Sequence, residues 1–153
     1  MSPFLRKPWQ DPLFWLALAA GPVCWLVIYL LLRPEPQWGW PLAAPLQYLL
    51  PALVYPVLEE IVFRGLLQEW VRERISERSF GPLSVANLLT SVVFTGLHFI
   101  YHPPLWAALV LFPSLVFGFF KDRTRGLAAP IILHCCYNAG FLWLFSGPFL
   151  GKP

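Results

Sequence analysis

The stretch that decides the fold is residues 13–32, LFWLALAAGPVCWLVIYLLL, which contains no charged side chain. Its 20 residues correspond to about 30 Å of α-helix, the thickness of the hydrocarbon core of a bilayer. Arg6 and Lys7 precede it, as basic residues precede a cleaved signal peptide. The run is too long for the apolar region of a signal peptide, however, and its Ala-Leu-Ala triplet at 17–19, which resembles a cleavage site, lies in the middle. We therefore expect a retained first membrane-spanning helix.

The whole chain has the same apolar character. Of its 153 residues, 58% are hydrophobic and 12% are charged, against about 25% charged in soluble domains, and the mean hydropathy is +0.60. This composition excludes a soluble enzyme and a disordered tail. The net charge of +3 is too weak and scattered for binding to nucleic acid. We predict an all-α fold, a polytopic membrane helical bundle that forms a single integral-membrane domain over residues 1–153.

Three further apolar runs bring the expected number of spans to about five. Residues 38–58 carry four prolines, so a broken or kinked helix is expected there, and it continues to about Arg78. Residues 80–120 form an uncharged stretch of 41 residues, enough for two spans, with a break at the prolines of 102–104. The last run covers residues 127–150.

The basic residues predict the direction of the spans. Eight of them fall on one side of the membrane if the spans alternate: Arg6, Lys7, Arg72, Arg74, Arg78, Lys121, Arg123 and Arg125. Arg33 and Lys152 fall on the other side. Because cytoplasmic loops are enriched in Lys and Arg, we expect the N-terminus in the cytoplasm. Residues 1–12 would lie at the interface of the membrane, which we expect to be the inner membrane of the cell.

Charged side chains within an apolar segment are rare and usually functional. Glu59 and Glu60 end the proline-rich run, and Arg64 follows them. Residues four apart share one helical face, so we expect Glu60 and Arg64 to pair. Glu59 is rotated by about 100° from Glu60 and has no local cation. It is therefore left to face another part of the protein.

Two more polar patterns lie on other predicted spans. One is a stripe of four side chains on a single helical face, which we interpret as the lining of a wet cavity: Asn87, Ser91, Thr95 and His98. The other is His134 with Asn138, spaced by four on the last span. Such a pair alone could simply join helices by hydrogen bonds. Polar groups occur on three predicted spans, in each case three or four residues apart and so on one helical face. This pattern favours a site that the three spans share.

The candidate site residues are therefore Glu59, Glu60, Arg64, His98, His134 and Asn138. A carboxylate beside a histidine can deprotonate a water molecule. Nearby His and Asn donors can stabilise the oxyanion of a tetrahedral intermediate. These residues favour hydrolysis of an amide without a covalent intermediate, a metal or a cofactor. The alternative is a zinc site of Glu59, His98 and His134, although the His-Glu-x-x-His signature of zinc proteases is absent.

Three motifs, in this order, resemble the CPBP family of intramembrane proteases, which is named for CAAX proteases and bacteriocin-processing enzymes. The family patterns Glu-Glu-x-x-x-Arg, Phe-x-x-x-His and His-x-x-x-Asn are matched by residues 59–64, 94–98 and 134–138. The resemblance covers about residues 55–140, which would be the catalytic core, and leaves the first span outside.

The resemblance implies a membrane-embedded glutamic peptidase like the type II CAAX prenyl endopeptidases of the family. It implies that Glu59 activates water with help from His98, and that His134 and Asn138 form the oxyanion hole. Glu60 and Arg64 would be supporting residues. The expected partners are the lipid bilayer and a peptide or protein substrate with a membrane anchor or a lipid-modified C-terminus.

The depth of the site in the membrane constrains where the helix that carries Glu59 begins. Helical rise places His98 about 7 Å below Pro103 and His134 about 10 Å from Leu127. Glu59 can meet them only if its helix begins near Pro51 or Pro56, as in a broken or re-entrant span. The site would then lie in the middle of the membrane, biased to its outer half, which suits the trimming of membrane anchors outside the cytoplasm.

Functions without proteolysis remain open. Some members of the family are self-immunity proteins, so a non-enzymatic membrane immunity or scaffold protein is one alternative. A small transporter or proton relay is another, because intramembrane Glu and His also serve there. The short chain without repeats argues against the transporter.

Overall fold

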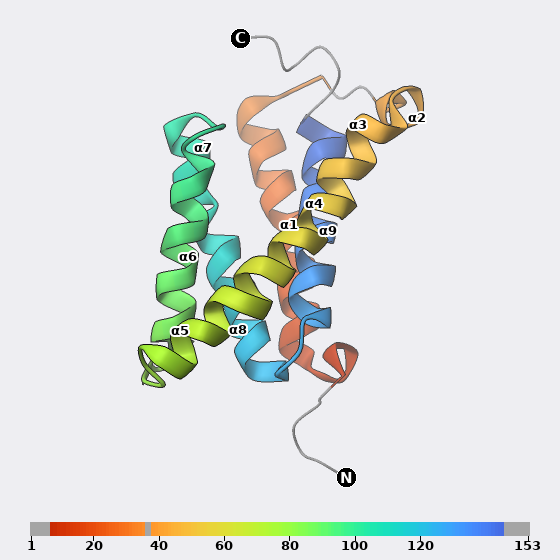
Figure 1. Ribbon diagram of the computed structural model, residues 1–153. Helices are drawn as coiled ribbons and strands as arrows, with labels where there is room; N and C mark the ends of the chain where they lie inside the picture. Colours follow the sequence, from red (N-terminus) through yellow and green to blue (C-terminus); the bar gives the residue numbers. More distant parts are fainter. Residues whose placement is uncertain (1–6, 36–37, 146–153) are drawn as a thin grey trace.

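The computed structural model describes residues 7–35 and 38–145, and this part of the chain is built almost entirely of helices (Figure 1). The strands within it are β1 (Ser79–Phe80) and β2 (Leu83–Ser84), which form a short antiparallel hairpin. The prediction of an all-α membrane helical bundle is confirmed. Residues 1–6 of the predicted interfacial segment, and Lys152, lie outside the described residues.

The helices before the hairpin are η1 (Pro8–Gln10), α1 (Pro12–Leu32), α2 (Trp40–Ala43), α3 (Pro45–Leu49), η2 (Leu50–Val54), α4 (Tyr55–Glu60), η3 (Ile61–Leu67) and α5 (Gln68–Arg74). Those after it are α6 (Val85–His98), α7 (Pro104–Leu109), α8 (Leu111–Thr124) and α9 (Ala128–Phe145). Among the described residues, four stretches are long and apolar enough to cross a bilayer: residues 12–32, 45–74, 104–124 and 128–145. The fifth predicted segment is α6, whose 14 residues span only about 21 Å.

The second span is one continuous helix from Pro45 to Arg74, which we call the oblique helix because it slants across the bundle in Figure 1. It contains α3, α4 and α5, joined by the π-helical stretches η2 and η3. The expectation of a helix that begins near Pro51 or Pro56 is wrong, because the wide π turns let the helix pass through both prolines. The helix also ends at Arg74, earlier than the predicted Arg78, because the chain then enters the hairpin.

The break predicted inside the long uncharged stretch is confirmed. The helix α6 ends at His98, and α7 begins at Pro104, directly after the proline that stops the preceding segment. From Pro104 the chain stays helical through α7 and α8 to Thr124. The helix α8 lies between α6 and α9 and packs on both of them.

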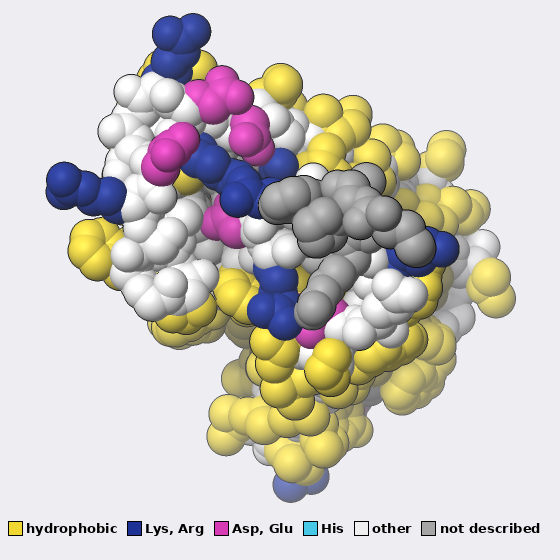
Figure 2. Space-filling view, turned by 90° about the horizontal axis from the view of Figure 1, so that it is seen from below, with side chains coloured by type: hydrophobic (Ala, Val, Ile, Leu, Met, Phe, Trp, Pro, Cys, Tyr) yellow, Lys and Arg dark blue, Asp and Glu magenta, His cyan; other side chains and the backbone are white. Residues whose placement is uncertain are grey.

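Charged side chains gather at the end of the bundle where α1 begins and the oblique helix and α8 end (Figure 2). Three ion pairs tie these segments together: Arg72 with Asp122, Lys121 with Glu69, and Arg123 with Asp11. Arg33 lies at the far end of α1. The predicted basic segments therefore share one end of the bundle, as alternating spans require. Which side of the membrane this end faces stays a prediction.

Polar contacts join the oblique helix to α8 at every fourth residue of both helices. The pairs of this polar ladder are Arg64 with Ser114, Gln68 with Gly118, and Arg72 with Asp122. Asp122 also accepts a 2.6 Å hydrogen bond from Ser84, which caps the start of α6. The ladder thus fixes the register of the oblique helix against α8, and its last contact also fixes α6.

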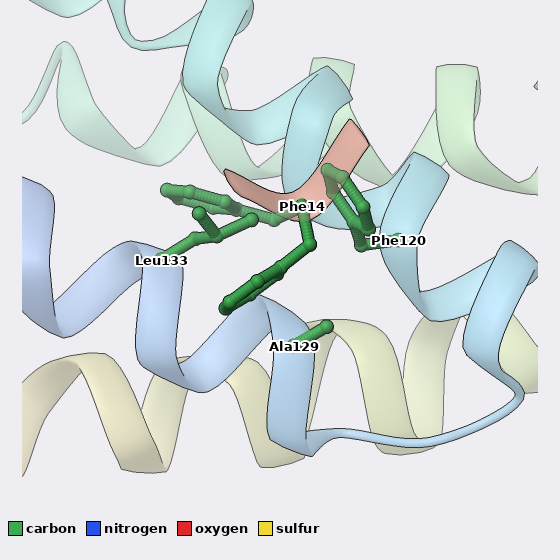
Figure 3. Close-up of a cluster of buried hydrophobic side chains, with 5 residues drawn as sticks. Phe14, Phe120, Ala129 and Leu133 are labelled. Atoms are coloured by element: carbon green, nitrogen blue, oxygen red, sulfur yellow. The ribbon is translucent and has the colours of Figure 1, made fainter. Parts of the chain in front are cut away.

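The apolar core lies where α1, α8 and α9 meet (Figure 3). Its five buried side chains are Phe14, Phe117, Phe120, Ala129 and Leu133. The rings of Phe14 and Phe120 meet edge to face, with their centroids 5.9 Å apart. Much of the remaining apolar surface is exposed, as expected for helices that face lipid tails rather than water.

Two glycines allow α1 and α9 to approach closely. Trp25 of α1 lies against Gly140 of α9, and Tyr137 of α9 lies against Gly21 of α1. The Tyr137 hydroxyl also donates a 2.5 Å hydrogen bond to the Ala17 carbonyl. Small residues at helix contacts are the usual means of association in a bilayer, because lipid tails are as apolar as the side chains.

We expect Gly140→Ala to destabilise the protein, because the added methyl group would overlap the Trp25 ring. Overpacking of this kind costs about 1–3 kcal/mol of unfolding free energy. The measurement is thermal unfolding in detergent micelles. The control is Gly96→Ala on α6, where an added Cβ meets nothing within 4 Å. Equal melting temperatures for the two variants would contradict the proposed close packing of α1 and α9.

Candidate active site

Glu59 and Glu60 lie where α4 passes into the π-helical stretch η3. The Glu60 side chain is completely buried, whereas that of Glu59 is 35% exposed. This difference follows from the helical rotation between neighbouring residues. The two carboxylates therefore occupy different environments although they are adjacent in sequence.

Glu60 pairs with Arg64 one turn along the same helix, as the spacing predicts. Oε2 of Glu60 lies 3.3 Å from Nε of Arg64, and both side chains are fully buried. Nη2 of Arg64 donates to Oγ of Ser114 at 2.6 Å and to the Ser114 carbonyl at 3.0 Å. The guanidinium also lies over the ring of Phe94, at 5.5 Å from its centroid. Both buried charges are thus compensated.

His134 of α9 lies between the two glutamates. Its Nδ1 is 2.9 Å from Oε1 of Glu60, and its Nε2 is 3.6 Å from Oε2 of Glu59. The Glu60 carboxylate can only accept a hydrogen bond, so Nδ1 of His134 must carry the hydrogen. Nε2 is then directed toward Glu59. The ring of Phe117 stacks on the imidazole, with centroids 4.7 Å apart and planes 22° apart.

His98 is fixed in a different way. Its Nδ1 lies 2.8 Å from the Phe94 carbonyl, so this nitrogen donates to its own helix, and Nε2 has no hydrogen-bond partner among the described residues. In the described part of the chain, no hydrogen bond or ion pair joins His98 to Glu59. The ring of Phe94 contacts both histidines, with centroid distances of 4.6 Å to His98 and 5.9 Å to His134.

Beside His98, the ring of His102 lies nearly parallel at 5.6 Å. Partial burial and the neighbouring His98 both lower the pKa of His102. His102 lies in the turn between α6 and α7, outside the predicted spans. The sequence predicted His102 only as part of the helix break at residues 102–104, not as a neighbour of the site.

Asn138 holds a backbone carbonyl that the proline pattern leaves without a partner. In η2 the Tyr55 amide donates to the carbonyl of Leu50, five residues earlier. The next donor in this register would be residue 56, which is a proline and has no N–H. The carbonyl of Pro51 is therefore orphaned, and Nδ2 of Asn138 donates to it at 3.0 Å. The second hydrogen on this nitrogen remains for another acceptor.

The structure brings Glu59, Glu60, Arg64 and His134 into one connected cluster, with Asn138 one turn beyond His134. The interpretation of the α6 stripe as a cavity lining is wrong for Asn87 and Ser91, which are fully buried. Asn87 donates to the Leu115 carbonyl at 2.9 Å, and Ser91 donates to Asn87 at 3.0 Å. These two side chains pack α6 against α8 because Gly118 leaves room for Asn87.

The alternative zinc site is not assembled. Within residues 7–35 and 38–145, no three or more His, Cys, Asp or Glu side chains are grouped so that they could hold a metal ion. His98 is held against its own helix by the Phe94 carbonyl, and His134 is held between the two glutamates.

Two contacts of this cluster were not anticipated from the sequence: Ser114 and Phe117, both on α8. They lie in an apolar segment that carries none of the three motifs. The only sequence signal in this segment is Ser114, a polar residue among apolar ones. No spacing rule connects it with Arg64, which lies 50 residues earlier.

The chain is similar to known membrane peptidases. The family described as "Type II CAAX prenyl endopeptidase Rce1-like" matches residues 40–140, which include all six candidate residues and exclude α1. A protein of Bacillus subtilis (strain 168) named "Putative membrane peptidase YdiL" is 30% identical over 97 residues. These residues are 63% of this chain and 36% of the relative, so the match spans about a third of that protein. No solved structure matches the chain.

We expect Asn138→Ala to destabilise the protein by about 1–3 kcal/mol, because it leaves the Pro51 carbonyl unsatisfied. Pro56→Ala would restore an N–H that can reach this carbonyl. In a double-mutant cycle the loss caused by Asn138→Ala should therefore be smaller in the Pro56→Ala background. Unfolding by denaturant in micelles measures all four proteins. Strict additivity would show that Asn138 does not serve this carbonyl.

Proposed function

We propose that the chain, which belongs to the Rce1-like family of type II CAAX prenyl endopeptidases, is a membrane protease that hydrolyses a peptide bond with a water molecule activated by Glu59. The observation that carries this proposal is the contrast between two adjacent carboxylates. Glu60 is buried and neutralised by Arg64, whereas Glu59 is partly exposed and lies beside His134. Of these two carboxylates, Glu59 is the one that a substrate and a water molecule can reach.

In the proposed reaction Glu59 accepts a proton from water as the hydroxide adds to the carbonyl carbon of the substrate. The carbonyl oxygen becomes an oxyanion, which needs donors. In its doubly protonated form, with Nδ1–H donating to Glu60, His134 presents Nε2–H at the site, and the second hydrogen of Asn138 Nδ2 can join it as a donor.

The reaction ends with cleavage of the C–N bond, as the proton that Glu59 took from water passes to the leaving amine. His98 supports this proton transfer in the proposal, because its Nδ1 is bound to the Phe94 carbonyl and its Nε2 has no partner in the part of the chain that the structure describes. Glu60 and Arg64 are supporting residues that hold His134. This mechanism uses no metal and no cofactor.

The family and the location within the membrane support a proposal for the substrate class. We propose a peptide or protein with a membrane anchor or a lipid-modified C-terminus, since the site lies among helices that cross the membrane. The chain is an integral membrane protein. We propose that residues 1–153 form one membrane domain with a catalytic core at 55–140, in the inner membrane, with its N-terminus and the charged end of the bundle in the cytoplasm.

The first test is cleavage by purified protein in micelles of peptides with and without a prenylated cysteine near the C-terminus. Glu59→Gln should lower the rate by about 100-fold or more, because it removes the general base and keeps the shape. The matched control is Glu69→Gln on the same helix, where the carboxylate pairs with Lys121 at the charged end. Full activity of Glu59→Gln would refute this mechanism, and rescue of a cellular phenotype by the same variant would favour an immunity or scaffold function.

A second test separates glutamic from zinc chemistry. Dialysis against a strong chelator should leave the cleavage rate unchanged, because the proposed base is a carboxylate and the donors are side-chain N–H groups. The rate is measured before and after chelation, and again after addition of zinc. Loss of activity on chelation and its return with zinc would favour a metalloprotease.

A further inference from the structure

The helix α8 carries none of the family motifs, yet it contacts the site at two places one turn apart. We propose that Ser114 and Phe117 of α8 are positioning residues that aim the imidazole of His134 at Glu59. This inference rests on the proposed peptidase function, because it concerns how the same site is held.

Ser114 acts at the far end of a chain of contacts. Both of its oxygens accept hydrogen bonds from Nη2 of Arg64, at 2.6 and 3.0 Å. Nε and Nη1 of Arg64 are buried and have no hydrogen-bond partner among the described atoms. The ion pair with Glu60 therefore lacks good hydrogen-bond geometry, and the two bonds to Ser114 are the directional contacts that fix the guanidinium.

The guanidinium in turn determines where Glu60 can lie. Oε2 of Glu60 is drawn to Arg64 at 3.3 Å, which turns Oε1 toward Nδ1 of His134 at 2.9 Å. Each contact is between buried side chains, so no water competes for the same position. A displacement of Arg64 would therefore pass through Glu60 to the imidazole.

Phe117 supplies the second constraint. One hydrogen bond at Nδ1 fixes a single point of the imidazole and leaves the tilt of the ring free. The Phe117 ring, which is 2% exposed, stacks on the imidazole and fixes its plane. With both the point and the plane fixed, Nε2 can only face Glu59. The two α8 residues thus complete the orientation that the motif residues begin.

The test compares Ser114→Ala, which removes the hydroxyl, with Ser114→Thr, which keeps it. We expect Ser114→Ala to lower kcat by about 10- to 100-fold with little change in KM, the usual effect of losing a supporting hydrogen bond. Ser114→Thr should restore most of kcat. The matched control is Ser91→Ala, which removes another fully buried serine hydroxyl whose hydrogen bond goes to Asn87 rather than to Arg64. It should keep kcat.

A second readout does not depend on activity. The chain has three histidines, so protein labelled with ¹⁵N-histidine gives three sets of imidazole resonances, and His134→Gln identifies the set that belongs to His134. We expect Ser114→Ala and Phe117→Leu to shift or broaden the His134 resonances and to leave those of His98 and His102 in place. Unchanged His134 resonances in Ser114→Ala would overturn the inference. If no peptide is cleaved but the resonances respond as expected, the proposed function fails and the positioning stands.

Discussion

The buried ion pair between Glu60 and Arg64 is the constraint on which the rest of the site depends. A single charge left unpaired in such surroundings costs several kcal/mol, so both partners must be held in place. Arg64 is held by α8, and Glu60 is held by His134 of α9. Three separate helices are therefore fixed relative to one another by one pair of charges. Glu59, the neighbouring residue, has no part in this support and is left available for chemistry.

The parts of the bundle that support the site differ from those that face lipid. The polar ladder between the oblique helix and α8 joins the buried charges to the charged end of the bundle. The helix α1, by contrast, packs on α9 through close contacts at two glycines, and it lies outside the family match. Only 6% of the apolar stretch of α1 is buried against the rest of the protein, so most of this helix faces the bilayer. It completes the core around Phe14 without contributing a candidate residue.

Local spacing in the sequence was enough to predict the helices, the break before Pro104 and the pair of Glu60 with Arg64. These features depend on neighbours within one turn or on runs of apolar residues, which a sequence displays directly. The roles of Ser114 and Phe117 depend on contacts between helices far apart in the chain, which no spacing encodes. The continuity of the helix through Pro51 and Pro56 was mispredicted because prolines were expected to interrupt it. The structure uses a wider turn instead, and Asn138 bonds the carbonyl that remains.

The π-helical stretch η3 has a geometric consequence for the whole oblique helix. In a regular α-helix each step of four residues overshoots a full circle by about 40°, so three steps from Glu60 to Arg72 would drift by about 120°. The wider turns of η3 advance each residue by a smaller angle and cancel part of this drift. One face of the oblique helix can then carry all four side chains, those of Glu60, Arg64, Gln68 and Arg72. Deletion of a single residue within η3 would rotate the side chains before it relative to those after it, so that they no longer share one face of the helix. The length of η3 is therefore as constrained as the identity of its charged residue.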